Sequence, residues 1–253
     1  MTTYVHVPYL KFFDYLETII QDRVNIELYL TANDIDSNPE INLERINRIL
    51  VDNGLICTVH GPFHDLSPGG LDQQIRKITY ERFLTLFDLV APLQPKVIVL
   101  HPGYDEIRYG DVKETWLENS KAFWEGIVEY ATKFNLKIAL ENTFEKGTGE
   151  IKSLLQGLSS PSLGHCFDIG HFNIFVNGSF ESWLKELGNY LFEVHLHDNH
   201  GEIDEHLALG NGNIDFQRFF SLLEGVKTKP ALTIEAHTEE DARISIARIN
   251  SYM

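Results

Sequence analysis

Short apolar runs alternate with longer segments from one end of the chain to the other. The runs occupy residues 4–9, 24–30, 56–63, 96–103, 136–143, 163–171, 191–199 and 231–237. After the third run, apolar residues recur at helical spacing at Ile75, Ile78, Phe83, Leu86 and Val90. Continuously apolar strands separated by helical segments are typical of a parallel sheet that is buried on both faces. Eight such units in a chain of this length predict an α/β fold, the closed (β/α)8 barrel or TIM barrel.

An open, doubly wound sheet is the main alternative to this barrel. Its dinucleotide-binding version carries a GxGxxG motif after the first strand, and no such motif follows residues 4–9. The proline and glycine clusters at 67–70, 147–149 and 210–212 each fall between a predicted strand and a predicted helix. They therefore mark loops and not a linker. We predict a single TIM-barrel domain over residues 1–253.

Composition narrows the choice of partner. The 253 residues include 21 Lys and Arg against 37 Asp and Glu, a net charge of −16, which opposes broad neutralisation of nucleic-acid phosphates. A ligand held through metal ions stays compatible with this charge, because the metal brings its own positive charge. Two cysteines provide neither a disulfide framework nor a thiolate zinc cluster. Neither a membrane span nor a leader pattern is present in the sequence, so we expect a cytoplasmic protein.

Ionisable residues collect where the predicted strands end. In a TIM barrel these ends form one rim, so their side chains should converge on a single cavity. Imidazoles and carboxylates are ligands for divalent cations, and a cation would offset the cost of burying several carboxylates together. The residues at or just after the strand ends are His60, His101, Glu141, Asp168, His171, His195, Asp204, His206 and Glu235.

Each of these residues also has a structural interpretation, because a single strand-end His or Glu often serves only as a hydrogen-bonding group or a helix cap. Their joint placement favours a metal site. The core metal set that we predict is Glu141, Asp168, His195 and Glu235. The residues left as additional ligands or neighbours of ligands are His60, His101, His171, Asp204 and His206. Of the remaining histidines, we place His64, His197, His200 and His237 on the rim and give His6 and His165 structural roles.

The strand-end motifs resemble those of the xylose-isomerase-like barrels, a superfamily that joins sugar isomerases and epimerases with endonuclease IV. The motifs are VHGPF, VLHPG, ALENT, CFDIGH, VHLHDN, DEHLALGNGNID and TIEAH, in the family's order along nearly the whole chain. In the isomerase and epimerase branch, the resemblance implies one divalent metal held by the four residues of the core set. In the endonuclease branch, it implies three zinc ions held by all nine residues.

The sequence favours the small-substrate branch. The loops TANDIDSNPE and NHGEIDEHLALGNGN contain no Lys or Arg with which to follow a DNA backbone. Aromatic residues that suit the apolar faces of a sugar lie near the rim, namely Tyr9, Phe12, Tyr29, Phe63, Tyr104, Phe144, Phe172 and Phe175. The resemblance then implies a divalent-metal-dependent sugar isomerase or epimerase that transfers a proton through a metal-stabilised enediolate.

In this interpretation Glu141 and Glu235 are the proton-transfer residues, while His60, His101 and His171 bind substrate. The metal could be Mn, Mg, Co or Zn, with Zn expected if several ions bind. Two alternatives stay open: an endonuclease IV-like tri-zinc phosphodiesterase that acts on abasic DNA, and a metal- or sugar-binding barrel without catalysis. The oligomeric state is not indicated by the sequence.

Overall fold

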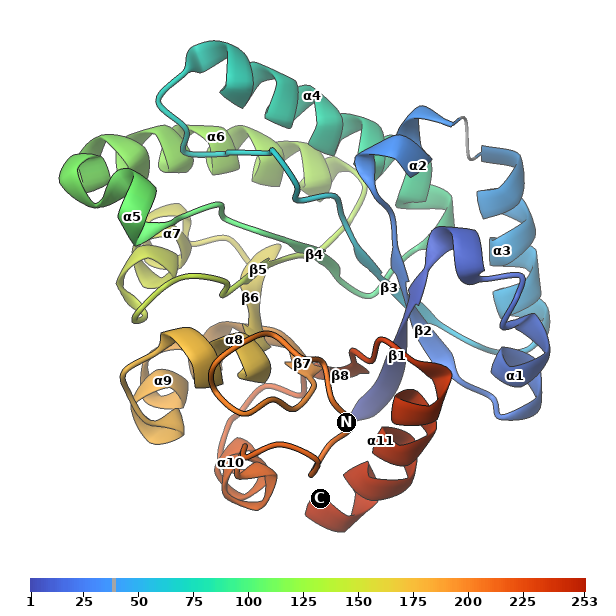
Figure 1. Ribbon diagram of the computed structural model, residues 1–253. Coiled ribbons are helices and arrows are strands. Elements are labelled where there is room, and N and C mark those ends of the chain that lie inside the picture. Colours follow the sequence, from blue (N-terminus) through green and yellow to red (C-terminus); the bar gives the residue numbers. More distant parts are fainter. Residues whose placement is uncertain (38–39) are drawn as a thin grey trace.

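Eight parallel strands close into a barrel in the computed structural model, which describes residues 1–37 and 40–253 (Figure 1). Each strand pairs with the next in the chain, and β8 pairs with β1 to complete the ring. The strands are β1 (Thr2–Pro8), β2 (Asn25–Tyr29), β3 (Cys57–His60), β4 (Ile98–Leu100), β5 (Ile138–Glu141), β6 (Leu163–Asp168), β7 (Leu191–Leu196) and β8 (Ala231–Ile234). The closed order confirms the predicted TIM barrel and excludes the open sheet.

Helices surround the barrel and cover its outer face (Figure 1). The α-helices are α1 (Leu16–Gln21), α2 (Ala32–Asp36), α3 (Glu40–Asp52), α4 (Gln73–Val90), α5 (Glu106–Tyr109), α6 (Lys113–Lys133), α7 (Gly149–Leu158), α8 (Ile169–Phe175), α9 (Phe180–Leu187), α10 (Phe216–Leu223) and α11 (Glu239–Tyr252). Short 3-10 helices occupy Tyr9–Lys11, Ala91–Leu93, Gly110–Val112 and Gly188–Tyr190. Among the residues described, none of the helices combines the length and apolarity that a membrane crossing requires.

The observed strands begin close to the predicted positions but end earlier. The fourth run was expected at 96–103, whereas β4 covers Ile98–Leu100, and the sixth was expected at 163–171, whereas β6 ends at Asp168. At Asp168 the carboxylate accepts a hydrogen bond from the backbone N–H of His171, at 2.6 Å, and so caps helix α8 directly. The chain therefore leaves the sheet where the polar strand-end residues begin.

The apolar core lies mainly between the strands and the helices, where large side chains such as Trp124 and Phe167 are fully buried. A second, small apolar cluster, separate from this core, consists of Val97, Val99, Ala139 and Cys166. Polar side chains occupy other inward positions of the buried strands, namely Glu27, Thr58, Glu193 and Thr233. The interior is therefore polar beneath the carboxyl-terminal mouth, and this arrangement positions the candidate site.

Candidate metal centre

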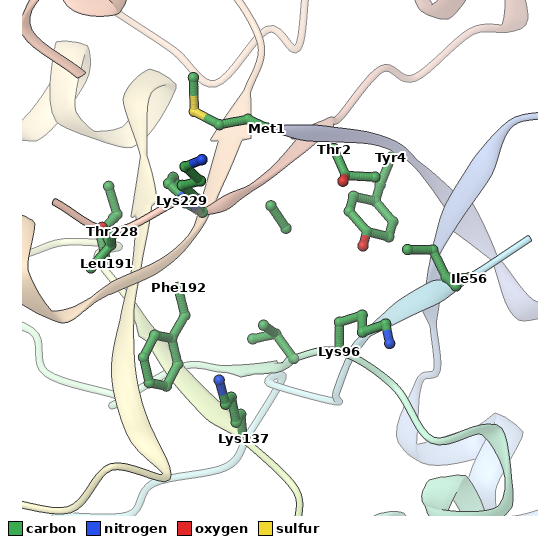
Figure 2. A pocket seen from close by; sticks show the side chains of 13 residues that line it. Met1, Thr2, Tyr4, Ile56, Lys96, Lys137, Leu191, Phe192, Thr228 and Lys229 are labelled. Atoms are coloured by element: carbon green, nitrogen blue, oxygen red, sulfur yellow. The ribbon is translucent and has the colours of Figure 1, made fainter. Parts of the chain in front are cut away.

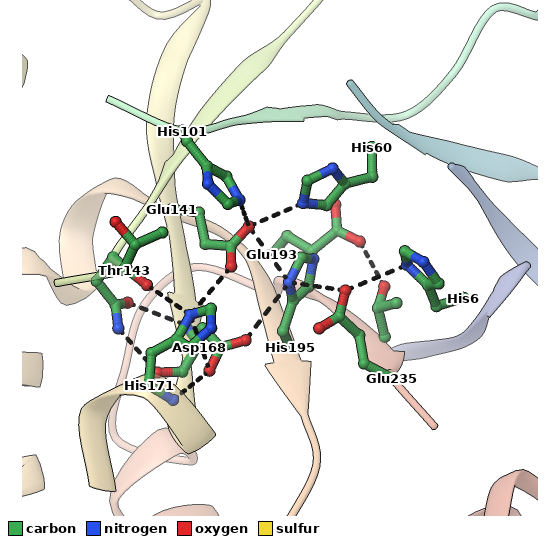
Figure 3. A network of polar contacts seen from close by, with 12 residues as sticks. His6, His60, His101, Glu141, Thr143, Asp168, His171, Glu193, His195 and Glu235 are labelled. Carbon is green, nitrogen blue, oxygen red and sulfur yellow. Dashed lines mark hydrogen bonds and ion pairs between the residues drawn. The ribbon is translucent and has the colours of Figure 1, made fainter. Parts of the chain in front are cut away.

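His195 lies at the centre of the carboxyl-terminal mouth and is fully buried (Figure 3). Its Nε2 is 3.1 Å from Oε1 of Glu27, a buried carboxylate on β2. Because a carboxylate only accepts, Nε2 of His195 carries the hydrogen. The opposite ring nitrogen, Nδ1, is buried without a hydrogen-bond partner among the described residues. Glu27 thus orients the ring so that Nδ1 faces the mouth.

Three carboxylates from three strands surround this nitrogen. Glu235 Oε1 is 3.4 Å from Nδ1 of His195, Glu141 Oε2 is 3.6 Å away and Asp168 Oδ2 is 3.7 Å away. An unpartnered imidazole nitrogen among three buried carboxylates matches the donor set that divalent cations bind. The structure therefore brings together the four residues of the predicted core set, and their chemistry fits a divalent cation.

Both glutamates of this set are ionised near neutral pH. Burial alone would raise the pKa of Glu141, but His101 and His195 outweigh it and hold that pKa well below its ordinary value. Burial opposes ionisation of Glu235 in the same way, and His195 and His6 keep its pKa well below the ordinary range. Positive charge beside these carboxylates is therefore what allows them to remain charged inside the protein.

His60 and His101 gather on the outer side of Glu141. Nδ1 of His60 donates to the carbonyl of Gly61 at 2.8 Å, which leaves its Nε2 facing Glu141 Oε2 at 3.0 Å. Nε2 of His101 approaches the same oxygen at 3.2 Å. His60, His101 and Glu141 present ligand atoms within 4.8 Å of one another, which is close enough for a shared metal ion.

A third cluster of ligand-type side chains forms around Asp204, in the loop after β7. Its Oδ2 is 3.0 Å from Nε2 of His206 and 3.3 Å from Nε2 of His171. Burial opposes ionisation of Asp204, but the hydrogen bonds from these two histidines lower its pKa below the ordinary value. All nine residues singled out in the sequence therefore lie around one mouth.

Two histidines occupy places that the sequence interpretation assigned wrongly. His6 was expected to be structural, yet it lines the mouth, with Nδ1 2.8 Å from Glu27 Oε2 and 3.1 Å from Glu235 Oε1. His197 was expected on the rim, yet it is buried, with Nε2 3.2 Å from both oxygens of Asp168. Gly170 allows this approach, because a Cβ there would lie 1.9 Å from the His197 ring.

The other assigned histidines lie as expected. His165 is structural, since its Nδ1 donates to the carbonyl of Leu140 and its Nε2 accepts from the indole of Trp183. His64 and His237 line the mouth, and His237 stacks on His206 with ring centroids 4.3 Å apart. His200 is exposed and pairs with Glu205.

The mouth opens into a cavity of about 1090 Å³ above the cluster. Of the eight aromatic residues considered, those that line it are Tyr29, Phe63, Tyr104, Phe144 and Phe175. Tyr9, Phe12 and Phe172 instead belong to the buried core. Among the described lining residues, Arg108 is the single Lys or Arg. The cavity therefore offers aromatic walls and imidazoles, with little positive charge for a nucleic-acid backbone.

Comparison with known proteins identifies the family. The xylose isomerase-like TIM barrel family matches residues 22–252, so the chain belongs to it, and the resemblance seen in the motifs is confirmed. The uncharacterized protein MJ1311 of Methanocaldococcus jannaschii is 33% identical over 202 residues, which are 77% of this chain and 69% of that protein.

Several of the similar proteins carry names that describe an activity. L-ribulose 3-epimerase of Methylomonas sp. is 30% identical over 128 residues, which are 48% of this chain and 43% of that enzyme. A crystal structure of a D-tagatose 3-epimerase-like protein matches all of this chain and 97% of its own, with a TM-score of 0.86 and 26% identity. The chain thus has the fold of proteins named for sugar epimerisation.

Proposed function

We propose that the protein is a divalent-metal-dependent isomerase or epimerase that acts on a sugar or a related hydroxy-carbonyl compound. The observation that carries the proposal is that two ionised glutamates lie next to the same imidazole nitrogen, Nδ1 of His195. Glu141 is on β5 and Glu235 follows β8. Two carboxylates at one centre can exchange a proton with neighbouring positions of a bound substrate. The relatives named as epimerases support this chemistry.

In this proposal the four residues of the core set hold the metal. Bound there, a divalent cation such as Mn, Mg, Co or Zn would polarise a carbonyl group and stabilise the negative charge that develops on its oxygen. Glu27 keeps the hydrogen of His195 on Nε2, so that Nδ1 remains available as a ligand.

Proton transfer falls to the two glutamates. One carboxylate takes the proton from the carbon next to the carbonyl, and the other first takes up a proton from solvent and then returns it from its own side. Return of a proton to the opposite face of the same carbon inverts its configuration. Return to the carbonyl carbon, with the adjacent hydroxyl proton passing to the former carbonyl oxygen, gives isomerisation. The substrate hydroxyls would be bound by His60, His101 and His171, and the aromatic walls would cover the apolar faces of the sugar.

Deuterium exchange tests the proposal. The protein, supplied in turn with Mn, Mg, Co or Zn, is incubated in D2O with L-ribulose, D-tagatose or D-allulose, and NMR follows deuterium entering the carbon next to the carbonyl. We expect exchange, and we expect Glu235→Gln to reduce it by at least about a hundredfold, because the amide cannot accept the proton. Glu205→Gln, which changes a glutamate in the neighbouring loop that pairs with His200, is the matched control.

Full exchange in Glu235→Gln would remove this residue from proton transfer. Binding of metal and sugar without any exchange would instead favour the non-catalytic barrel.

A second candidate function rests on the cluster of His171, Asp204 and His206. The mouth then holds three adjoining groups of ligand-type side chains: the core set, the pair His60 and His101 next to it, and this cluster. Three metal ions held there would suit a phosphodiesterase, in which metals bind the scissile phosphate and activate water. Because Arg108 is the single Lys or Arg among the described lining residues, we rank this candidate below the sugar enzyme.

Metal content separates the two candidates. The zinc-loaded protein is analysed by native mass spectrometry for ions per chain and is incubated with duplex DNA that contains one abasic site. One ion and no strand cleavage are expected for the sugar enzyme. Three ions with cleavage that is lost in Asp204→Asn would establish the phosphodiesterase instead.

A further inference from the structure

A second cavity, of about 610 Å³, lies at the opposite end of the barrel, where the strands begin (Figure 2). Three exposed lysines surround it: Lys96 before β4, Lys137 before β5 and Lys229 before β8. The sheet fixes the backbones of two of them, since the N–H of Lys96 donates to the carbonyl of Cys57 at 2.9 Å and the carbonyl of Lys137 accepts from the N–H of Ile98 at 2.8 Å. The sheet therefore holds Lys96 and Lys137 beside the cavity, and Lys229 lies in the loop that leads into β8.

The lysines approach the cavity from opposite sides. In the closed strand order β4 lies opposite β8, and Figure 2 shows Lys229 across the cavity from Lys96 and Lys137. Within the described residues, no carboxylate lines the cavity and none of the three forms an ion pair. The composition would not predict a cavity lined by lysines without carboxylates, because Asp and Glu outnumber Lys and Arg 37 to 21 in the chain.

Three unpaired ammonium groups around one hollow create a positive potential that a multivalent anion would relieve. The walls between them also carry neutral groups. The Tyr4 side chain lines the cavity and brings a hydroxyl. The Phe192 ring forms an apolar wall beside Lys137, and Ile56 lies on the opposite side of the cavity (Figure 2). Nζ of Lys137 lies 5.2 Å from the centre of the Phe192 ring, so cationic and aromatic surface adjoin each other.

We propose that this amino-terminal cavity binds a small organic phosphate of the nucleotide class. The lysines would bind the phosphates as point charges, and the flat apolar part of the ligand would lie against the ring of Phe192. The cavity is large enough for such a ligand, and barrel interior separates it from the carboxyl-terminal mouth. The binding site is thus independent of the proposed catalysis and does not require it.

Isothermal titration calorimetry with ADP and with inorganic pyrophosphate tests this site in the metal-loaded protein. We expect both to bind, with ADP the tighter because it also covers the apolar wall. The variant Lys96→Gln/Lys137→Gln/Lys229→Gln should lose at least about tenfold in affinity for each, because charge-assisted hydrogen bonds are removed. Its matched control is Lys77→Gln/Lys133→Gln/Lys185→Gln, which removes the same charge from the outer helices and should bind normally.

Several results would overturn the proposal: no binding to the unaltered protein, an equal loss in the outer-helix control, or a loss in Glu141→Gln that the pocket variant does not share. The last result would place the anion at the carboxyl-terminal mouth. Equal affinities for ADP and pyrophosphate would overturn the role of the apolar wall. If circular dichroism shows that the triple variant is unfolded, Lys229→Gln alone serves, because Lys229 lies in a loop outside β8.

Discussion

The two ends of the barrel differ in charge, although the same eight strands form both. At the carboxyl-terminal mouth, buried carboxylates are held next to imidazoles, and Arg108 is the one Lys or Arg among the described lining residues. At the amino-terminal mouth, three lysines surround a cavity that no described carboxylate lines. The difference shows that the net charge of −16 does not predict the local charge at either end of the barrel. The local charge depends on which strand-end residues the closed barrel brings together.

Between the two ends, the barrel interior keeps its own polar groups. Glu193 accepts hydrogen bonds from the hydroxyls of Thr58 and Thr233, and burial raises its pKa well above the ordinary value. Glu27, one layer closer to the carboxyl-terminal mouth, has a pKa of about 2, because His195 and His6 outweigh the effect of burial. The imidazoles therefore decide which buried glutamates are charged, and the predictions below test this conclusion.

Removing a carboxylate from the centre should have the largest effect. Glu141→Gln takes away the charge that faces His60, His101 and His195, so we expect turnover to fall roughly a thousandfold and bound metal per chain to fall with it. Turnover assays and elemental analysis measure these two losses. Glu81→Gln on helix α4, which pairs with Lys77, is the control. Normal metal content in Glu141→Gln would contradict a ligand role.

A smaller loss, of metal affinity, is expected when Glu27 is changed, because Glu27 contacts the ligand His195 and not the metal. Glu27→Gln keeps the shape of the side chain but weakens its hold on Nε2 of His195, so the ring no longer presents Nδ1 as firmly. Metal affinity should fall about 10- to 100-fold while the fold is retained, as is usual for partners of ligating histidines. Competition titration with a metal-sensitive dye measures the change. Affinity unchanged from that of the unaltered protein would show that His195 is oriented without Glu27.

The sequence alone predicted the barrel and the nine strand-end residues, but it missed Glu27 and misassigned His6 and His197. The strand-end rule succeeds because residues that terminate parallel strands must share one rim. Glu27 and His6 instead lie inside β2 and β1, where they face each other in register. Their signal was a polar residue at an inward position of an apolar run, as in VNIELYL.

The misplacement of His197 has a different cause. Its ring is buried because Gly170, in the preceding connection between β6 and β7, leaves room for it, and this contact joins residues 27 positions apart in the chain. The lysine cluster escaped notice for the same reason. Lys96, Lys137 and Lys229 form a group only after the barrel closes. Residue types and periodicity identify strands, whereas side-chain packing across the barrel requires the folded structure.

The smallest expected effect comes from a buried glutamate beside the same mouth that lacks an imidazole hydrogen bond among the described residues. Glu145 accepts from the backbone N–H of Thr143 at 2.7 Å, and burial raises its pKa from 4.5 to about 7. The folded protein keeps this carboxyl neutral between those pH values, while the unfolded chain ionises it. Its contribution to stability is therefore complete below about pH 4.5 and is lost as the pH rises through about 7.

Glu145→Gln should accordingly raise the melting temperature by a few degrees at pH 8, corresponding to about 1 kcal/mol, and change it little at pH 5. Thermal unfolding followed by circular dichroism at the two pH values measures the difference. Glu186→Gln, on the exposed side of helix α9, controls for the loss of one negative charge. An equal shift at both pH values would show that Glu145 is ionised in the folded protein. A buried carboxylate at this mouth would then remain charged without an imidazole hydrogen bond, contrary to the explanation given for Glu141 and Glu235.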